Sequence, residues 1–319
     1  MADRMGAAIL GGPARTGAQP ASRRRGSLAR LGRRRSTIAI GLCLPLIAVL
    51  FGLKLYPTLF GIYLSMLNKR MDEFVGLANF QFLLGRNTFQ MVIFQSCFFA
   101  ISAVILKAVT GFVLAHLMHN IRGRHERLWR GLLLVPWVIP LSLSTLTWWW
   151  LLDPSYSAFN WTLQWLGFDK ISFLGDTWNA RIAVVVVNTW FGAPFFMIMY
   201  LAALKSVPDQ LYEAAAIDGA NAWQKLFFVT LPMMRNIIAI TVLYSLIVTF
   251  ADFDIVRILT NGGPQDATHL FATYAFTIGI QSGNIPRGAA VSLFMLPILA
   301  TFAFFILRGV NKRNKEIQA

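Results

Sequence analysis

Six apolar segments, each long enough to cross a membrane, constrain this chain more than any other feature of its sequence. They cover residues 37–66, 88–118, 131–152, 182–204, 236–256 and 288–309. A helix needs about 20 residues to cross a hydrocarbon core of roughly 30 Å. Because a backbone in lipid must satisfy its own hydrogen bonds, we expect an all-α membrane protein with six transmembrane helices.

The composition supports a membrane location. Of the 319 residues, 56% are hydrophobic and only 13% are charged, whereas a soluble domain carries about 25% charged residues. The loops between the apolar segments are all shorter than the roughly 50 residues of a small soluble domain. Any energy source or substrate-capturing module must therefore be another polypeptide or an ion gradient.

The distribution of basic residues predicts the orientation of the chain. Of the 29 Lys and Arg, 20 lie in the N-terminal tail, the loop after the second segment, residues 205–235 and the C-terminal tail. The three opposite loops hold only 7. The positive-inside rule then places both termini in the cytoplasm. We expect a disordered basic tail over 1–36, a transmembrane domain over 37–310 and a second cytoplasmic tail over 311–319.

Several function classes find no support in the residues. The net charge of +15 does not indicate a nucleic-acid surface, because the basic residues separate apolar segments instead of covering one face of a folded domain. The four histidines lack the spacing of a metal site. No Ser-His-Asp set is suggested, so we expect neither a metal nor a catalytic centre.

The cytoplasmic segment 205–232 is the most informative part of the chain. Ser206 and Asp209 have the spacing of a capping box, which predicts a helix start. Good helix formers follow, and Gly219 predicts the helix end because glycine accepts a left-handed conformation. The three alanines from 214 to 216 give this helix a shallow face that another protein can approach closely.

A second amphipathic helix is expected from Ala222 to Val229, and Pro232 is expected to break the chain before the fifth apolar segment. The pattern alone leaves two interpretations open. The hairpin is either an interfacial helix lying on lipid headgroups or a docking element for another protein, with Glu213 beside the flat face.

This segment resembles the EAA motif of binding-protein-dependent ABC importer permeases. That motif reads Glu-Ala-Ala, three residues, Gly, nine residues and Ile-x-Leu-Pro. Here Glu213-Ala214-Ala215 is followed by Gly219 and by Val229-Thr230-Leu231-Pro232, with valine for isoleucine as the one departure. Leu77–Phe80 and Ile258–Pro264 resemble the carbohydrate-uptake branch, in particular its maltose-type first permease subunit. The resemblance covers residues 40–309.

The resemblance implies a type I ABC importer permease fold in the bacterial inner membrane. It implies three kinds of partner besides lipid: a second permease subunit in a heterodimer, a dimer of ATPase subunits, and a periplasmic or lipid-anchored solute-binding protein. ATP and Mg would bind the ATPase, since this chain lacks a Gly-x-x-x-x-Gly-Lys-Ser/Thr loop and is not itself an enzyme. The residues implied in coupling to the ATPase are Glu213, Ala214, Ala215, Asp218, Gly219, Leu231 and Pro232.

Polar and aromatic residues in the apolar segments are candidates for the substrate pathway, because polar groups in a membrane are costly. The candidates are Asn188, Trp190, Tyr244, Ser245, Asp252, Asp254 and Trp149. Several have a simpler explanation: the Trp cluster at 148–150 suits an interfacial belt, the aspartates suit the outer boundary and Asn188 suits an interhelical hydrogen bond. Lys54 and Lys107 are read as snorkelling or paired.

The resemblance suggests a di- or oligosaccharide, a glycoside or a polyol as substrate. The sequence leaves open whether that sugar is neutral or anionic; Arg257 or Arg287 at the outer face would favour an anion. The alternative is an ion-coupled secondary transporter, which predicts inverted repeats and midplane carboxylates. A membrane-embedded enzyme needs a catalytic cluster that the sequence does not offer.

Overall fold

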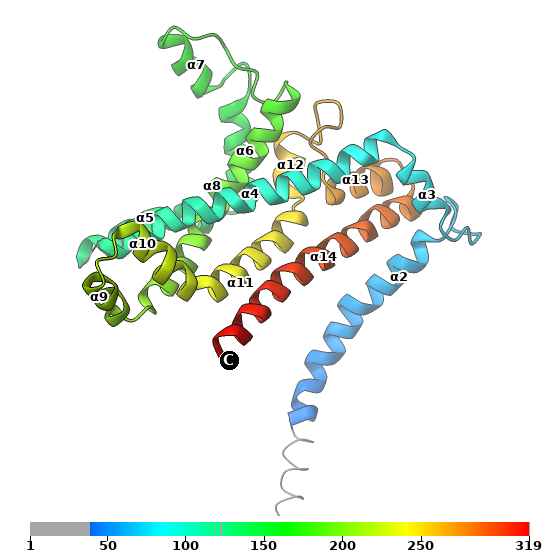
Figure 1. Cartoon of the computed structure of the whole chain (residues 1–319). Coiled ribbons are helices and arrows are strands. Elements are labelled where there is room, and N and C mark those ends of the chain that lie inside the picture. Colours follow the sequence, from blue (N-terminus) through cyan, green and yellow to red (C-terminus); the bar gives the residue numbers. More distant parts are fainter. Residues whose placement is uncertain (1–38, 122, 319) are drawn as a thin grey trace, which may run out of the picture. The chain divides into compact units, whose positions relative to one another are not determined.

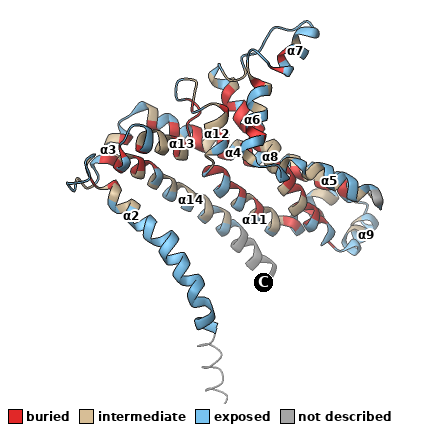
Figure 2. Ribbon diagram, turned by 180° about the vertical axis from the view of Figure 1, so that it is seen from behind, coloured by how far each residue is buried: buried red, intermediate tan, exposed pale blue. Residues whose placement is uncertain are grey.

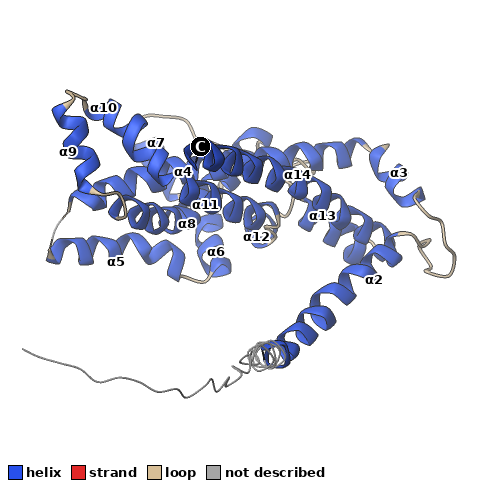
Figure 3. Ribbon diagram, turned by 60° about the horizontal axis from the view of Figure 1, so that its bottom comes forward, coloured by secondary structure: helices blue, strands red, loops and turns tan. Residues whose placement is uncertain are grey.

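A computed structural model describes residues 39–121 and 123–318, and nearly all of this backbone is helical (Figure 1). Among the described residues, five helices are long and apolar enough to cross a membrane, and a bent pair of helices makes a sixth when it is counted as one span (Figure 3). They are Ala39–Ser65, Asn87–Asn120, Thr177–Lys205, Ala222–Phe250 and Ile285–Gly309, with His125–Val138 and Leu141–Leu152 as the bent pair. The prediction of an all-α membrane protein is confirmed.

The chain divides into two compact units, Met1–Thr58 and Leu59–Ala319. The described part of the first unit belongs to the first span and includes the π-helix η1 (Phe51–Leu55). Every residue from 39 to 58 is exposed. An apolar helix without cover from its own unit needs lipid or another subunit against it. The tail expected over 1–36 lies outside the described residues.

The second unit begins within α2 (Tyr56–Ser65) and is centred on α4 (Asn87–Asn120), α8 (Thr177–Lys205) and α11 (Leu231–Phe250). Figure 2 shows buried residues along these three helices. One core cluster joins Met118 of α4, Tyr200 of α8 and Met234 of α11. This packing buries large apolar side chains and holds the polar residues of the same helices at fixed positions.

The third span is broken as its prolines predict. α5 (Arg124–Val138) contains Pro136, and α6 (Leu141–Leu152) starts after Pro140. The two helices are bent by 87°, because proline lacks an N–H and collides with the preceding turn. A short outer helix, α7 (Ala158–Trp165), follows and is capped by the Ser157 hydroxyl, which accepts from the Asn160 N–H at 3.1 Å.

The fifth span differs from its prediction. α10 (Ala222–Lys225), the π-helix η2 (Leu226–Thr230) and α11 form one continuous helix, so the expected break at Pro232 and the expected bounds 236–256 are wrong. Pro232 lies in the first turn of α11, where its missing N–H is tolerated. The Thr230 hydroxyl donates to the Lys225 carbonyl at 3.2 Å and so satisfies an acceptor at the π turn.

The remaining elements close the outer side of the second unit and lead to the last span. They are α3 (Ala78–Leu84), α12 (Asp254–Leu259), α13 (Phe271–Phe276), the π-helix η3 (Thr277–Gln281) and α14 (Ile285–Gln318). α14 continues through residues 311–318, so the expected C-terminal tail is an extension of the sixth helix.

Candidate functional site

The residues of the expected coupling hairpin form α9 (Asp209–Ile217) and the turn that follows it. Gly219 has a φ of +75°. The Ala220 N–H donates to the Ala215 carbonyl at 2.9 Å, and the Gly219 N–H donates to the Ala216 carbonyl at 3.1 Å. This is a Schellman motif. The helix end at Gly219 is therefore confirmed.

The helix start differs from the expectation. α9 begins directly after Pro208, which makes no side-chain capping bond. The Ser206 hydroxyl donates instead to the Ala203 carbonyl at 2.7 Å, so it belongs to the end of α8. The capping box predicted for Ser206 and Asp209 is therefore absent, because the intervening proline fixes an extended backbone that separates the two residues. A capping box does occur at α10, between Asn221 and Gln224.

α9 exposes its side chains. None of its residues is buried, and Glu213 and Ala214 are exposed. Within the described residues Glu213 makes no ion pair and no hydrogen bond. Ile217 is 87% exposed, and Trp223, Phe227 and Phe228 of the following helix are exposed as well. Exposed large apolar side chains of this kind mark a surface that contacts another protein or the membrane.

A hydrogen bond ties α9 to the start of α11. The Tyr212 hydroxyl lies 3.0 Å from the Thr230 hydroxyl, at the π turn that precedes Leu231 and Pro232. A cavity of about 490 Å³ lies beside this link and is lined by Leu204, Asp209, Tyr212 and Trp223, among others. This hydrogen bond connects α9 to the helix that continues into α11.

A separate group of polar residues links three helices of the second unit. We call these residues the polar cluster: Lys107, Asn188, Thr249 and Asp252. The Asn188 amide donates to Asp252 Oδ2 at 3.2 Å, and Lys107 Nζ donates to Thr249 Oγ1 at 2.6 Å. Lys107, Asn188 and Thr249 are buried, and Asp252 is half-buried. The cluster joins α4, α8 and the end of α11.

Of the seven candidate pathway residues, the structure brings Asn188 and Asp252 into contact and places Ser245 nearby. Ser245 is buried on α11 one turn before Thr249, so the two share a helix face. Asp254 is exposed at the first position of α12. It is not one of the residues that make the hydrogen bonds of the cluster.

The aromatic candidates form separate contacts. The Trp190 ring lies 5.6 Å from that of Trp148, whereas Trp149 is exposed. Tyr244 is 57% exposed, and its ring lies 5.3 Å from that of Phe195. Exposed aromatic rings on a chain of this kind can be covered by lipid, by another subunit or by a ligand.

Thr249 was not among the residues predicted from the sequence, and Lys107 was expected to snorkel or to pair. A threonine in an apolar helix gives no signal of its own, because its hydroxyl usually bonds the preceding turn. Lys107 gave a signal, namely a charge amid an apolar run. The side chain does not snorkel: it is only 4% exposed. The burial of Lys107 depends on which face of α4 packs against α8, and the sequence alone does not show that packing.

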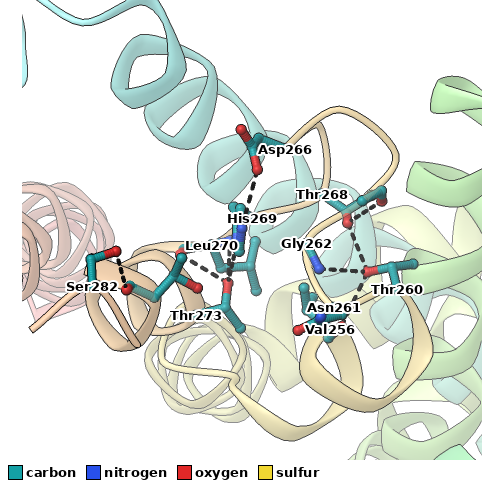
Figure 4. Close-up of polar contacts among 12 residues, drawn as sticks. Val256, Thr260, Asn261, Gly262, Asp266, Thr268, His269, Leu270, Thr273 and Ser282 are labelled. Carbon is teal, nitrogen blue, oxygen red and sulfur yellow. Dashed lines mark hydrogen bonds and ion pairs between the residues drawn. The ribbon is translucent and has the colours of Figure 1, made fainter. Parts of the chain in front are cut away.

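The outer loop after α12 is fastened by its own polar contacts (Figure 4). The Thr260 and Thr268 hydroxyls lie 2.7 Å apart, and the Thr268 hydroxyl also contacts the Gly263 carbonyl at 2.7 Å. His269 Nδ1 lies 3.1 Å from the Thr273 hydroxyl. Burial lowers the pKa of His269, partly offset by Asp266. This loop includes part of Ile258–Pro264, which resembles the carbohydrate-uptake branch.

The described residues contain no group of three or more side chains suited to hold a metal ion. Their main polar features are an exposed hairpin, a hydrogen bond from that hairpin to the helix that continues into α11, and a largely buried polar cluster that joins α4, α8 and the end of α11. This arrangement suits conformational coupling between a soluble partner and a membrane pathway.

Comparison with known proteins agrees with this geometry. The trehalose/maltose transport system permease protein MalF of Thermococcus litoralis is 32% identical over 235 residues, covering 74% of this chain and 79% of that protein. The diacetylchitobiose uptake system permease protein DasB of Streptomyces coelicolor is 31% identical over 258 residues, covering 79% of this chain and 78% of that protein.

A solved structure shares the fold. The crystal structure of a bacterial ABC transporter involved in the import of the acidic polysaccharide alginate aligns with a TM-score of 0.76 at 23% identity. The alignment covers 89% of this chain and 99% of that one. Residues 107–316 match the family described as binding-protein-dependent transport system inner membrane component. Since this match spans more than half of the sequence, the chain belongs to the family of binding-protein-dependent transport system inner membrane components.

Proposed function

We propose that this chain is a permease subunit of an ATP-driven sugar importer. It forms half of the translocation pathway together with a second permease subunit. A separate ATPase dimer, which binds ATP and Mg, drives it through α9, and a solute-binding protein delivers the substrate from outside. The substrate class is a di- or oligosaccharide, a glycoside or a polyol.

The observation that carries this proposal is the state of α9. Glu213 is exposed and lacks a partner among the described residues, while Tyr212 on the same helix contacts Thr230 at 3.0 Å. One face of α9 is thus available to a partner, and the other is tied to α11. An ion-coupled secondary transporter has no separate ATPase to bind, so that alternative does not explain the exposed face of α9.

Two relatives support the choice of sugars. The names of the proteins from Thermococcus litoralis and Streptomyces coelicolor refer to trehalose, maltose and diacetylchitobiose. Each of these proteins is similar to this chain over about three quarters of its length. The family match over residues 107–316 includes the polar cluster. The alginate transporter supports the fold alone, because its identity to this chain is 23%.

A charge reversal tests the coupling role. We expect Glu213→Arg to abolish co-purification of the ATPase, or to reduce sugar uptake at least tenfold, with the permease still inserted in the membrane. Glu73→Arg is the matched control, since Glu73 is also exposed but lies in a loop expected on the outer side. Normal assembly and normal uptake in Glu213→Arg would contradict the proposal.

A further inference from the structure

Lys107 places a positive charge inside the membrane bundle. It lies near the middle of α4, is only 4% exposed and donates one hydrogen bond, to Thr249 Oγ1 at 2.6 Å. No carboxylate of the described residues lies within ion-pairing distance of its ammonium group. An ammonium has three N–H donors, so hydrogen-bonding capacity remains. Asp252 acts on this charge only at longer range than an ion pair. A buried charge that is balanced only at longer range is costly and indicates a function.

The neighbouring helix is shaped to accept this lysine. A Cβ atom added at Gly192 of α8 would lie 2.4 Å from Lys107 Cδ. Any larger residue would therefore collide with the lysine side chain. Asn188 lies one turn before Gly192, so the two residues share a face of α8. The lysine stem and the Asn188 amide consequently meet on the same side of that helix.

Asp252 supplies the opposite charge in the cluster. Its Oδ2 accepts from the Asn188 amide at 3.2 Å, and its Oδ1 accepts from the Ile255 N–H at 3.1 Å. Asn188 Oδ1 is buried and has no hydrogen-bond partner. The cluster thus combines unused ammonium donors with an unused amide acceptor and a half-buried carboxylate. A sugar hydroxyl both donates and accepts, and so suits both kinds of group.

Charge decides which sugars fit such a cluster. Lys107 and Asp252 together carry no net charge, and Asp254, two residues farther along, adds a negative charge. A carboxylate on the substrate would be attracted by Lys107 but repelled by both Asp252 and Asp254, so the balance of charge disfavours an anion in a medium of low dielectric constant. A neutral polyhydroxylated ligand meets no such penalty.

We propose that Lys107 is a specificity-determining residue of the translocation pathway. Its ammonium group offsets Asp252, so that the polar cluster accepts neutral sugars and rejects sugar acids. This inference rests on the proposed function, because it assigns substrate contacts to the polar cluster of a sugar importer. It also decides between the neutral and anionic substrates that the sequence leaves open.

The test uses the intact importer, with its partner permease, ATPase and solute-binding protein, reconstituted in proteoliposomes. ATP-dependent uptake is measured for maltose, trehalose and diacetylchitobiose, and for digalacturonate as the anionic probe. The variants are Lys107→Met, which keeps a flexible stem without the charge, Asp252→Asn, which is nearly isosteric, and the double variant. Lys54→Met is the control, because Lys54 is an exposed lysine of the first span.

We expect the wild-type complex to import a neutral sugar and not digalacturonate. Lys107→Met should lower neutral-sugar uptake at least tenfold, and the double variant should recover part of that loss because it removes both charges. Asp252→Asn leaves Lys107 uncompensated, so the ratio of digalacturonate to neutral-sugar uptake should rise at least tenfold. Lys54→Met should behave as wild type.

The contrary outcomes separate a failure of this inference from a failure of the proposed function. Wild-type uptake and unchanged preference in both single variants would overturn the role of Lys107 and leave the importer function standing. Preferential wild-type import of digalacturonate would do the same. A wild-type complex that imports no sugar on the addition of ATP would overturn the proposed function and this inference together. If Lys107→Met fails to co-purify with the ATPase, Asp252→Asn alone tests the inference, through its ratio of digalacturonate uptake to neutral-sugar uptake.

Discussion

Two residues, Glu213 and Gly219, determine the surface that α9 exposes. Glu213 is the exposed carboxylate of α9, and Gly219 ends that helix with a φ of +75°. A side chain other than glycine is strained in this region of backbone conformation. The glycine therefore fixes where the hairpin turns, and so fixes how α9 presents its charge.

Gly219→Ala should loosen α9 without a steric collision, since no atom lies within 4 Å of the position of the added Cβ. We expect a local cost of about 1 kcal/mol from the left-handed backbone, roughly a fivefold increase in local opening. Hydrogen exchange of the α9 amides measures it. The control is Gly131→Ala, where the added Cβ also meets open space and the backbone is helical. Equal exchange rates in the two variants would argue against a strained turn.

His269 makes the outer loop sensitive to acid. Burial lowers its pKa, so the folded loop holds a neutral imidazole. In the unfolded loop the pKa returns to about 6.5, so the open form binds more protons and stability falls as the pH drops below that value. We expect faster hydrogen exchange of residues 262–273 at pH 5 than at pH 7.5, after correction for intrinsic rates.

His269→Gln should remove this pH dependence, because glutamine keeps hydrogen-bonding capacity without titrating. A loop that opens equally in wild type and variant across the same pH range would mean that His269 does not control its stability. Asp266, at 3.5 Å from the imidazole, limits the size of the effect, since a nearby carboxylate favours protonation.

At the scale of elements, the main feature is the contact between α9 and α11, which connects an exposed helix to a transmembrane helix. The Tyr212 hydroxyl lies 3.0 Å from the Thr230 hydroxyl, and Thr230 also satisfies the Lys225 carbonyl at the π turn. π turns occur frequently at functional sites. Here the turn lets one helix run from the hairpin into the membrane without a break.

Tyr212→Phe should weaken transmission between these helices while leaving the exposed face of α9 intact. The lost hydrogen bond is worth about 1 kcal/mol, roughly a fivefold effect on an equilibrium. We expect the number of ATP molecules hydrolysed per sugar imported to rise, with normal binding of the ATPase. Tyr156→Phe, an exposed tyrosine of the outer loop, should keep the wild-type ratio. An unchanged ratio in Tyr212→Phe would show that coupling takes another route.

Elements also show what the sequence could and could not predict. The broken third span was predictable, because two prolines stand four residues apart, and the end of α9 was predictable from one glycine. The continuous fifth helix was not, because a π turn at Leu226–Thr230 has no composition signal. Lys107 was underestimated for a related reason: its environment depends on how α4 packs against α8.

At the scale of the whole molecule, the described chain offers surfaces that it does not cover itself. Within the second unit, none of the residues of α9 is buried, and Glu213 and Ile217 are exposed. An exposed helix that carries an unpaired carboxylate beside large apolar side chains can contact another molecule. The family to which the chain belongs, an inner membrane component of a transport system, agrees with that.

The orientation of the second unit follows from its basic residues and is testable. We expect a cysteine at position 213 to react with an impermeant maleimide only from the cytoplasmic side, and a cysteine at position 73 only from the outer side. The background variant replaces Cys43 and Cys97 by alanine. Labelling of position 213 from outside the cell would reverse the orientation and remove the basis for coupling.

The most direct measurement places a photocrosslinking amino acid at position 213 of the assembled importer and irradiates it with and without ATP. We expect a covalent adduct with the ATPase subunit, with a yield that changes when ATP binds, and no adduct with the solute-binding protein. An adduct with lipid alone, or with no other subunit in either state, would contradict the claim that α9 is where the ATPase drives this chain.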